Sequence, residues 1–353
     1  MNLLLLTDSP TTYRAMAVAR CARSAAASVD VLSASGSRVF ALSRTIRFRN
    51  ECGIDDVRAA GDAIVSRIDE VCRRGDVDVV VPVDLESVLC LARVGPRITA
   101  VSFPTPSPDV FAMLHDKVTL ARFLVEHDLP TPRTRTFEEF MERSDLVCPV
   151  IVKPRAAEGS AGVRRIDSIE QLHPLSRAAT GSLLIQEFVD GEEIDLNVLA
   201  DRGRIVAWTI QRGVSAGVLE FVHDEAVLEI GRRLVAASSF HGPANIDMRR
   251  SRDGVPLVID VNPLLWDTVA ASCWTGVNFP ILGALQALGR PLPPVTAPAG
   301  VRYLTLRRAA TTLLRDRRPR DLSAASWRGL REAVAEPLVT LYQMFATRST
   351  PSR

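Results

Sequence analysis

The stretch ANIDMRRSRDGVPLVIDVNPLLW, from Ala244 to Trp266, indicates how the rest of the chain is organised. It predicts two short strands joined at Asp253-Gly254, a dipeptide that favours a two-residue type I′ hairpin turn. Side chains alternate between the two faces of a strand, so one face of the second strand is expected to be apolar. That apolar face would hold Leu257, Ile259 and Val261.

A two-residue turn also places polar side chains opposite one another on the other face of the hairpin. Asp247 is then opposite Asp260, and Asn245 is opposite Asn262. Two carboxylates about 5 Å apart at Cβ repel each other, and a divalent cation between them reverses that interaction. Carboxylate and amide oxygens from few residues suit Mg²⁺, which keeps water and phosphate ligands. The stretch alone fits equally well a surface hairpin whose polar face meets water, and a longer turn would shift the register.

The composition is that of a soluble globular chain of 353 residues, with 47% hydrophobic and 24% charged residues. This length allows two or three domains. The net charge of +2 argues neither for nor against nucleic acid, and we expect no nucleic-acid partner. MNLLLL has no basic leader and is followed by a turn-forming segment, so it predicts a buried strand rather than a signal peptide. No stretch approaches the roughly 20 apolar residues that span a bilayer, so no integral membrane segment is expected.

The six cysteines are scattered and form no CxxC pair, which predicts free core thiols in a cytoplasmic protein. Lysine is rare: of 43 lysine and arginine residues, only Lys117 and Lys153 are lysines. A GC-rich coding sequence explains the excess of arginine. A site that needs a compact point charge, such as a phosphate contact, is one explanation for the two positions that keep lysine. The alternative for Lys117 is an ordinary solvated charge on a helix.

The first hundred residues alternate between strand-like and helix-like segments. Strands are expected at 3–6, 29–33, 77–83 and 98–103, and helices at 13–27, 55–73 and 84–93. This βαβ rhythm predicts a parallel sheet covered on both faces. The absence of a GxGxxG motif gives a dinucleotide-binding interpretation no support.

After a proline-rich joint at 104–108, one helix is predicted from Pro108, with an apolar stripe that ends at Val125. A strand at 149–154 leads into a loop of small residues, whose backbone NH groups could hold phosphates. Residues 183–200 predict two strands, with polar residues alternating along the second. This polar face, which faces either solvent or a cleft, carries Glu193, Asp195 and Asn197.

Six short motifs in this order resemble the ATP-grasp superfamily. They are His115-Asp116-Lys117, Val152-Lys153-Pro154, Gly159 to Gly162, Gln186 to Glu193, Asn245-Ile246-Asp247 and Asp260-Val261-Asn262-Pro263. The resemblance implies an α/β chain in which an N-terminal βαβ parallel-sheet domain precedes an α+β ATP-grasp domain, with nucleotide bound between two antiparallel sheets. The implied limits are 1–106 for the N-terminal domain, 107–290 for the ATP-grasp domain, and 291–353 for a proline linker and an arginine-rich helical segment.

The resemblance further implies a ligase that uses ATP and Mg²⁺, with Mn²⁺ as an alternative metal, to join a carboxylate to an amine. Phosphate contacts would come from Lys117, Lys153 and the loop of Gly159, Ser160 and Gly162. Nucleoside contacts would come from Gln186, Glu187, Phe188, Val189 and Glu193. Metal ligands would be Asp247, Asp260 and Asn262.

Two positions depart from the pattern of the superfamily. Many members have glutamate at Asp260 and arginine at Leu264. Arg249 shares a strand face with Asp247 and is the predicted replacement, so Lys153 and Arg249 are the expected catalytic residues. The departures leave two alternatives, a non-catalytic ATP-binding regulator or scaffold and an ATP-grasp phosphotransferase. The expected partners are ATP and small carboxylate and amine substrates, with a homodimer left open.

Overall fold

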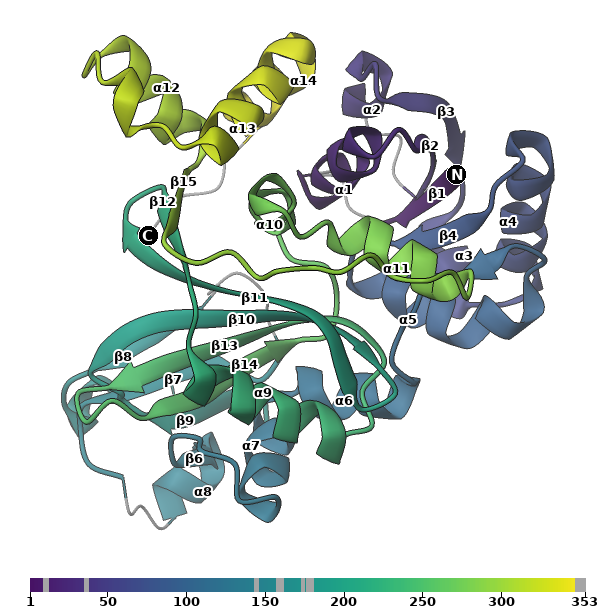
Figure 1. Cartoon of the computed structure of the whole chain (residues 1–353). Helices are drawn as coiled ribbons and strands as arrows, with labels where there is room; N and C mark the ends of the chain where they lie inside the picture. Colours follow the sequence, from purple (N-terminus) through teal and green to yellow (C-terminus); the bar gives the residue numbers. More distant parts are fainter. Residues whose placement is uncertain are drawn as a thin grey trace.

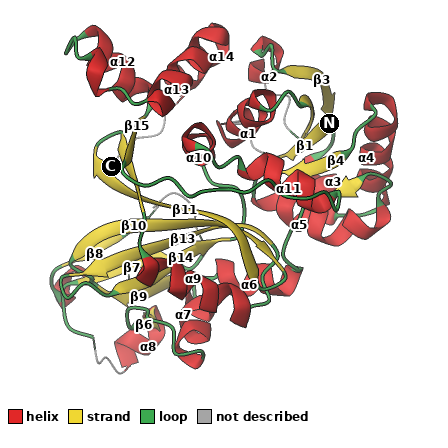
Figure 2. Cartoon of the chain, viewed as in Figure 1, coloured by secondary structure: helices red, strands yellow, loops and turns green. Residues whose placement is uncertain are grey.

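The computed structural model of the chain describes residues 1–8, 13–34, 38–142, 146–156, 162–172, 175 and 181–346. These residues form sheets of five, six and four strands. The five-stranded sheet lies in the N-terminal part, and the two other sheets lie one above the other in the part that follows (Figures 1 and 2). The predicted fold class is confirmed. No helix in these residues is both long enough and apolar enough to cross a membrane.

The N-terminal sheet is parallel, with strand order β3-β2-β1-β4-β5. Its strands are β1 (Asn2–Thr7), β2 (Ser28–Ser33), β3 (Ile46–Glu51), β4 (Val79–Pro82) and β5 (Val101–Ser102). The accompanying helices are α1 (Tyr13–Ser24), α2 (Arg38–Leu42), α3 (Ile54–Ala59), α4 (Asp62–Gly75) and α5 (Leu85–Val94), with a short 3₁₀ helix η1 (Gly95–Arg97). Leu3 to Leu6 are fully buried, as a strand covered on both faces requires.

Two predictions in this part need correction. The helix expected at 55–73 is two helices, because Ala60 adopts a left-handed backbone with φ of 49° and ends α3. α2 and β3 were not predicted from the sequence. The neighbouring elements α1, β2 and α5 were predicted. Asp84 caps α5 by accepting a hydrogen bond from the backbone N of Ser87.

The helix predicted from Pro108 is also broken. α6 (Pro108–His115) ends at Asp116, whose extended backbone lets its carboxylate cap the new helix α7 (Lys117–Glu126). The predicted apolar stripe is buried except for its last member, Val125, which is 68% exposed. The break makes Lys117 the first residue of α7, where its side chain is buried rather than solvated.

The two later sheets are antiparallel. The smaller has the order β6-β9-β7-β8, with β6 (Thr134–Thr136), β7 (Val150–Pro154), β8 (Arg164–Ile166) and β9 (Leu183–Glu187). The larger has the order β14-β13-β10-β11-β12-β15, with β10 (Gly191–Asp201), β11 (Arg204–Ser215), β12 (Val218–Val222), β13 (Gly242–Ser251), β14 (Pro256–Asn262) and β15 (Val301–Leu304). The helices α8 (Phe137–Glu142) and α9 (Glu225–Ala237) and the 3₁₀ helix η2 (Ile169–Leu172) accompany them.

The hairpin of β13 and β14 has the predicted pairing at its polar end and a different one near its turn. Asp247 pairs with Asp260, as expected, but Met248 pairs with Val258. Ile259 is therefore an extra residue, a β-bulge in β14. The bulge turns Val258 into the core, where it is fully buried, so the predicted apolar face of Leu257, Ile259 and Val261 is wrong for its first two members.

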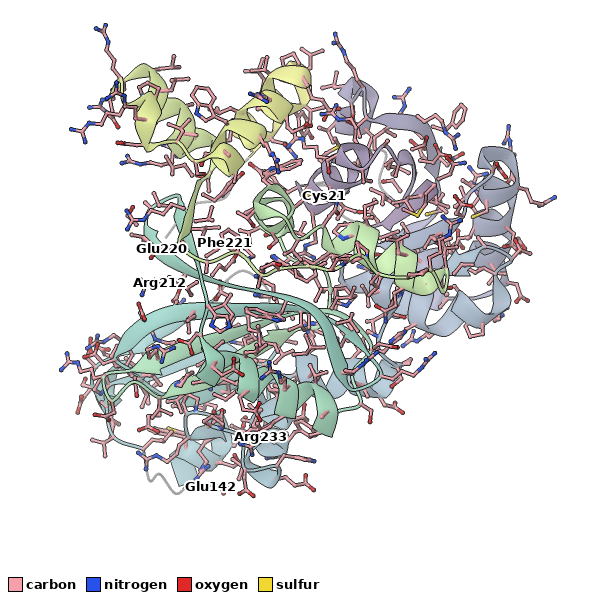
Figure 3. The ribbon with its side chains drawn as sticks, viewed as in Figure 1. Cys21, Glu142, Arg212, Glu220, Phe221 and Arg233 are labelled. Atoms are coloured by element: carbon pink, nitrogen blue, oxygen red, sulfur yellow. The ribbon has the colours of Figure 1, made fainter. Side chains whose placement is uncertain are left out.

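The segment after β14 connects the two parts of the molecule. α10 (Val269–Thr275) packs on α1, and α11 (Phe279–Ala287) contacts β4 on one side and β10 and β13 on the other. All six cysteines are free, as predicted, and Cys21 lies on α1 facing α10 (Figure 3). The predicted domain limits stay predictions.

The C-terminal segment closes onto both parts. β15 pairs with β12, and three helices follow, α12 (Leu306–Leu314), α13 (Ala324–Ala335) and α14 (Pro337–Ala346), with a 3₁₀ turn η3 (Pro319–Asp321). Glu336 is 1% exposed between α13 and α14. Its Oε1 accepts hydrogen bonds from Ser43 Oγ at 2.5 Å and from Thr45 N and Oγ1 at 3.0 and 2.8 Å. This contact fastens the C-terminal helices to the N-terminal part.

Candidate functional site

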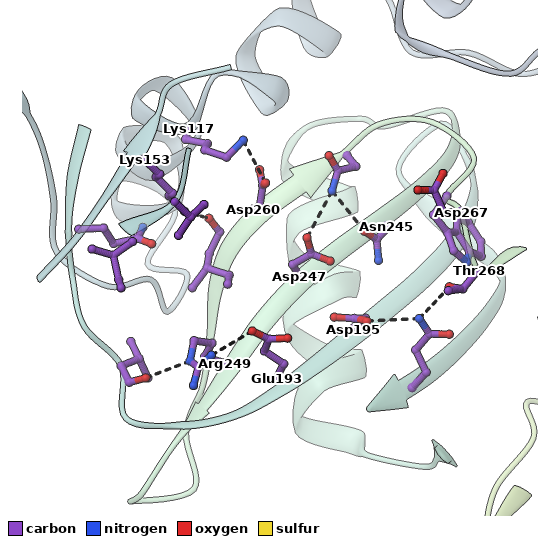
Figure 4. Close-up of a pocket in the computed structure, with 18 of the residues that line it drawn as sticks. Lys117, Lys153, Glu193, Asp195, Asn245, Asp247, Arg249, Asp260, Asp267 and Thr268 are labelled. Atoms are coloured by element: carbon purple, nitrogen blue, oxygen red, sulfur yellow. Dashed lines mark hydrogen bonds and ion pairs between the residues drawn. The ribbon is translucent and has the colours of Figure 1, made fainter. Parts of the chain in front are cut away.

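A cavity of about 390 Å³ lies between the four-stranded and the six-stranded sheet (Figure 4). Eleven of the residues predicted to form a site line it. They are Lys117, Lys153, Gln186, Glu187, Phe188, Val189, Glu193, Asp247, Arg249, Asp260 and Asn262. Segments from residue 117 to residue 262 thus converge on one cavity.

Carboxylates form a row across the floor of this cavity. The strand register places Gln211, Asp195, Asp247 and Asp260 directly opposite one another on β11, β10, β13 and β14. Gln211 Nε2 donates to Asp195 Oδ2 at 3.2 Å. We call Asp195, Asp247 and Asp260 the carboxylate row. Neighbouring members repel each other, since cross-strand partners lie about 5 Å apart at Cβ.

The electrostatics of the carboxylate row reflect this crowding. Burial, together with Asp195 and Asp260, raises the pKa of Asp247 well above its usual range. Burial raises the pKa of Asp195 to about 6, and Glu193 adds to the effect, while the hydrogen bond from Gln211 opposes it. The raised pKa values mean that the charged forms of these carboxylates are disfavoured. A cation bound beside the carboxylate row would offset the repulsion and would therefore be favourable.

A second row runs parallel to the first, two residues further along the strands. It holds Thr209, Asn197, Asn245 and Asn262, on β11, β10, β13 and β14. We call it the amide row. Asn262 Nδ2 donates to Asn245 Oδ1 at 3.2 Å and to Asp247 Oδ2 at 3.3 Å, so this side chain joins the two rows.

Both lysines approach Asp260 from the other sheet and from α7. Lys117 Nζ lies 3.0 Å from Asp260 Oδ2, and Lys153 Nζ donates to the backbone oxygen of Ile259 at 2.9 Å. That oxygen belongs to the bulge residue. The pKa of Lys153 is lowered to about 8, because burial and the charge of Lys117 lower it by more than Asp260 and Asp247 raise it. The lysines therefore lie side by side in a desolvated site that would accept anionic groups.

The residues that were predicted to contact a nucleoside line the opposite end of the cavity. Gln186 is buried and donates to Thr134 Oγ1 at 2.9 Å, and Glu187 forms an ion pair with Arg133 at 3.1 Å. Phe188 lies beneath the guanidinium of Arg165, 4.3 Å from ring centroid to Cζ. This end of the cavity thus combines the aromatic ring of Phe188 with the polar side chains of Gln186 and Glu187.

Arg249 holds the connection between β9 and β10 at this end. Its guanidinium donates to the backbone oxygens of Val189 and Gly191 and forms an ion pair with Glu193 at 3.1 Å (Figure 4). Gly191 lets β10 approach β13 closely at this point, because a Cβ on residue 191 would lie 1.7 Å from the backbone oxygen of Arg250. Arg249 is thus beside Glu193, on the far side of the carboxylate row from Asn262 and Leu264.

The loop predicted to cover phosphates is described only at its end. Gly159 and Ser160 lie outside the described residues. Gly162 has a φ of +77°, a left-handed backbone that favours glycine, and its position for a Cβ lies 2.9 Å from Pro154 Cγ. Gly162 is thus packed on the end of β7, one residue beyond Lys153.

The cavity also has lining residues that were not among the predicted nucleotide, metal and catalytic residues. Leu264 is 1% exposed and packs with Val88 and Phe111, although it also borders the cavity. The same end is lined by Arg14 of α1, whose Nε lies 3.1 Å from Asp267 Oδ1. Further lining residues include Asp195, Gln211, Asn245, Trp266 and Thr268. Strand register could have revealed Gln211, whereas nothing near Arg14 in the sequence indicates a site.

Known proteins resemble the chain in parts of its sequence and in its fold. Residues 179–309 match the family described as ATP-grasp in the biosynthetic pathway with Ter operon. D-alanine–D-alanine ligase of Anaeromyxobacter dehalogenans is 26% identical over 158 residues, which is 38% of this chain and 51% of that protein. The chain spans about half or less of the length of the curated relatives it matches.

Solved structures that resemble most of the chain include the following two. N5-carboxyaminoimidazole synthetase of Staphylococcus aureus has a TM-score of 0.65 and 13% identity, covering 91% of this chain and 86% of its own. L-amino acid ligase of Bacillus licheniformis has a TM-score of 0.61 and 17% identity, covering 84% and 75%. At these identities the likeness is one of fold. The resemblance to the ATP-grasp superfamily is confirmed.

Proposed function

We propose that this ATP-grasp protein is an ATP- and magnesium-dependent ligase that joins a carboxylate to an amine. The observation that carries the proposal is the convergence of two lysines, the carboxylate row and the segment from Gln186 to Val189 on one cavity between two sheets. The ligase names of the relatives support the same class of reaction.

ATP would lie along the cavity with its base at the Gln186 to Val189 end and its phosphates at the lysines. Glu193 would accept hydrogen bonds from the ribose hydroxyls, and Lys117 and Lys153 would neutralise phosphate oxygens. Because Lys117 pairs with Asp260 at 3.0 Å, its positive charge already lies at that end of the cavity.

The residues at this end fit a divalent cation. Asp247 and Asp260 offer hard oxygen ligands. In the described part of the chain, Asn262 uses its amide nitrogen in both of its side-chain hydrogen bonds, which leaves Oδ1 for the cavity. No cluster of three or more His, Cys, Asp or Glu side chains there is arranged to hold a metal ion, so phosphate and water oxygens would complete the shell. Bound Mg²⁺, or Mn²⁺ in its place, would withdraw charge from the phosphate oxygens.

The chemistry would proceed in two steps. A substrate carboxylate oxygen bonds to the γ-phosphorus, and the bond from that phosphorus to the β–γ bridging oxygen breaks, releasing ADP. The amine nitrogen then bonds to the acyl carbon, inorganic phosphate leaves, and the amine loses a proton. In the first step both reactants are anionic, so the lysines reduce their repulsion by fixed positive charge.

Arg14 is the better candidate than Arg249 for a cation near the transferred group. Leu264 cannot supply a charge, and Arg249 is held by two backbone oxygens and Glu193 at the ribose end. Arg14 lies at the Leu264 end of the cavity, beside Asp267. The catalytic role of Arg249 stays a prediction, and we expect it to shape the ribose pocket.

The proposal is tested by incubating the purified protein with ATP, Mg²⁺ and pooled amino acids. Release of ADP and free phosphate is expected, and Asp247→Ala should abolish it while Asp253→Ala, in the β13–β14 turn, should not. Phosphate that stays on the organic product would indicate a phosphotransferase. Binding of ATP in a calorimeter without ADP release from any pool would favour the non-catalytic regulator, which the burial of Leu264 supports.

A further inference from the structure

The amide row continues beyond the cavity into the interior of the protein. Asn262 donates to Asn245, Asn245 Nδ2 donates to Asn197 Oδ1 at 3.1 Å, and Asn197 Nδ2 donates to Thr209 Oγ1 at 3.3 Å. Thr209 Oγ1 lies 3.2 Å from Ser272 Oγ of α10. The row thus connects four adjacent strands and a helix through one chain of hydrogen bonds.

The three asparagine side chains of the amide row have the same orientation. Asn262, Asn245 and Asn197 each donate from the side-chain nitrogen to the next residue inward, and the oxygens of Asn245 and Asn197 accept from the residue before. The terminal torsion of asparagine has two nearly equivalent settings, which exchange the oxygen and the nitrogen. Rotation of one member would set two oxygens or two NH₂ groups against each other. The members therefore fix each other's settings.

The inner members of the row have no contact with the cavity. Asn197, Thr209 and Ser272 are each 0% exposed, and none of them lines the cavity, whereas Asn245 and Asn262 do. A polar group this deep needs a hydrogen-bond partner to offset its desolvation. A valine or leucine at these positions would fill the same space without that requirement. Packing alone therefore does not explain why these buried positions are polar.

We propose that Asn245, Asn197 and Thr209 are positioning residues that hold Asn262 with its Oδ1 toward a bound divalent cation. With the opposite setting, Asn262 would present an NH₂ group, which cannot bind a cation. Because the inference takes Asn262 as a metal ligand, it rests on the proposed function. Outer partners that orient a ligand commonly change metal affinity by about 10- to 100-fold when replaced.

The experiment measures Mn²⁺ binding to the full chain in the presence of ADP, by electron paramagnetic resonance. Thr209→Val removes the acceptor of Asn197 and should weaken Mn²⁺ binding about 10-fold. Asn197→Leu removes the acceptor of Asn245 as well and should weaken it more. Thr209→Ser keeps the hydroxyl and should restore wild-type binding. Thr312→Val, which replaces a buried threonine of α12, serves as the matched control.

The affinity for ADP in EDTA and the melting temperature are measured alongside. A merely structural role would lower both together with Mn²⁺ affinity, and that result would overturn the inference. Unchanged Mn²⁺ binding in both Thr209→Val and Asn197→Leu would also overturn it. Failure of the wild-type chain to bind Mn²⁺ with ADP would instead refute the metal site of the proposed function. If Thr209→Val does not fold, the order of affinities among wild type, Thr209→Ser and Asn197→Leu decides the question.

Discussion

Replacing Asp247 by asparagine should make the ligand-free protein more stable while it abolishes metal-dependent nucleotide binding. Asp247 is the central member of the carboxylate row, with Asp195 and Asp260 opposite it on the two neighbouring strands. Asparagine has nearly the same shape and can still accept the hydrogen bond that Asn262 donates. The substitution therefore removes charge and leaves the packing in place.

The size of the effect follows from the strand spacing. Two unit charges about 5 Å apart interact by about 3 kcal/mol at an effective dielectric constant of about 20. Three features reduce the effect: solvent screening, the positive charge of Lys117 beside Asp260, and the raised pKa of Asp247, which disfavours its charged form. A gain of about 1–2 kcal/mol in the free energy of unfolding remains. In a chain of 353 residues each kcal/mol shifts the melting temperature by about 1.3 °C, so the melting temperature should rise by about 1–3 °C.

The assay is differential scanning calorimetry with and without ADP and Mg²⁺. The wild-type chain at a ligand concentration of about 100 Kd should gain about 2.7 kcal/mol. Asp247→Asn should start from the higher melting temperature and gain nothing from adding Mg²⁺ to ADP. Asp253→Asn removes an exposed carboxylate from the β13–β14 turn and should leave both measurements unchanged. A lower melting temperature in Asp247→Asn, or a retained Mg²⁺-dependent gain, would refute the reasoning.

Two further predictions concern α1 and the C-terminal helices. Arg14→Met should lower the rate of ADP release about 100-fold, a loss typical of one transition-state contact, and calorimetry should show unchanged ATP affinity. The control Arg23→Met changes an arginine on the same helix that is paired with Glu332, and it should leave the rate unaltered. Equal rates in the two variants would exclude a role for Arg14. Glu336→Gln should lower the free energy of unfolding by about 2 kcal/mol at neutral pH, because hydrogen bonds to a charged group are lost. Burial alone would raise the pKa of Glu336, but hydrogen bonds from Ser43 and Thr45 outweigh it and hold the pKa low. The stabilisation by Glu336 is therefore present above about pH 4.5 and lost as the pH falls below that value. The melting temperatures of wild type and Glu336→Gln should converge in acid. A difference in melting temperature that stays constant with pH would contradict this account.

The carboxylate pair of the hairpin could be predicted from the sequence, although the turn was wrong. A two-residue turn gives the pairing of Asp247 with Asp260 directly. The observed chain near the turn is one residue out of that register, and the extra residue Ile259 restores it at the site. Bulges depend on how a strand packs on its neighbours, which alternation along one strand does not record. The predicted pairing of Asp247 with Asp260 is therefore correct, because the shifted pairing near the turn and the extra residue Ile259 cancel.

Other features depended on contacts that local patterns do not contain. The break at Asp116 was missed because an aspartate inside an apolar-periodic segment is tolerated, and only its capping geometry shows that a new helix begins there. Arg14 lies more than two hundred residues from Asp267, its partner. By contrast, Glu193 and Asp195 could be placed together from alternation along β10, because the period of two is a local property.

The pairing of β15 with β12 determines how the chain can be shortened. A chain cut in the proline-rich segment before residue 299 would lose β15 and leave the backbone of β12 unpaired along one side. Unpaired strand edges recruit other strands, so such a truncated protein should associate into oligomers or aggregates rather than remain monodisperse. A shortened protein made to study the ATP-binding region alone should therefore extend at least to Leu304.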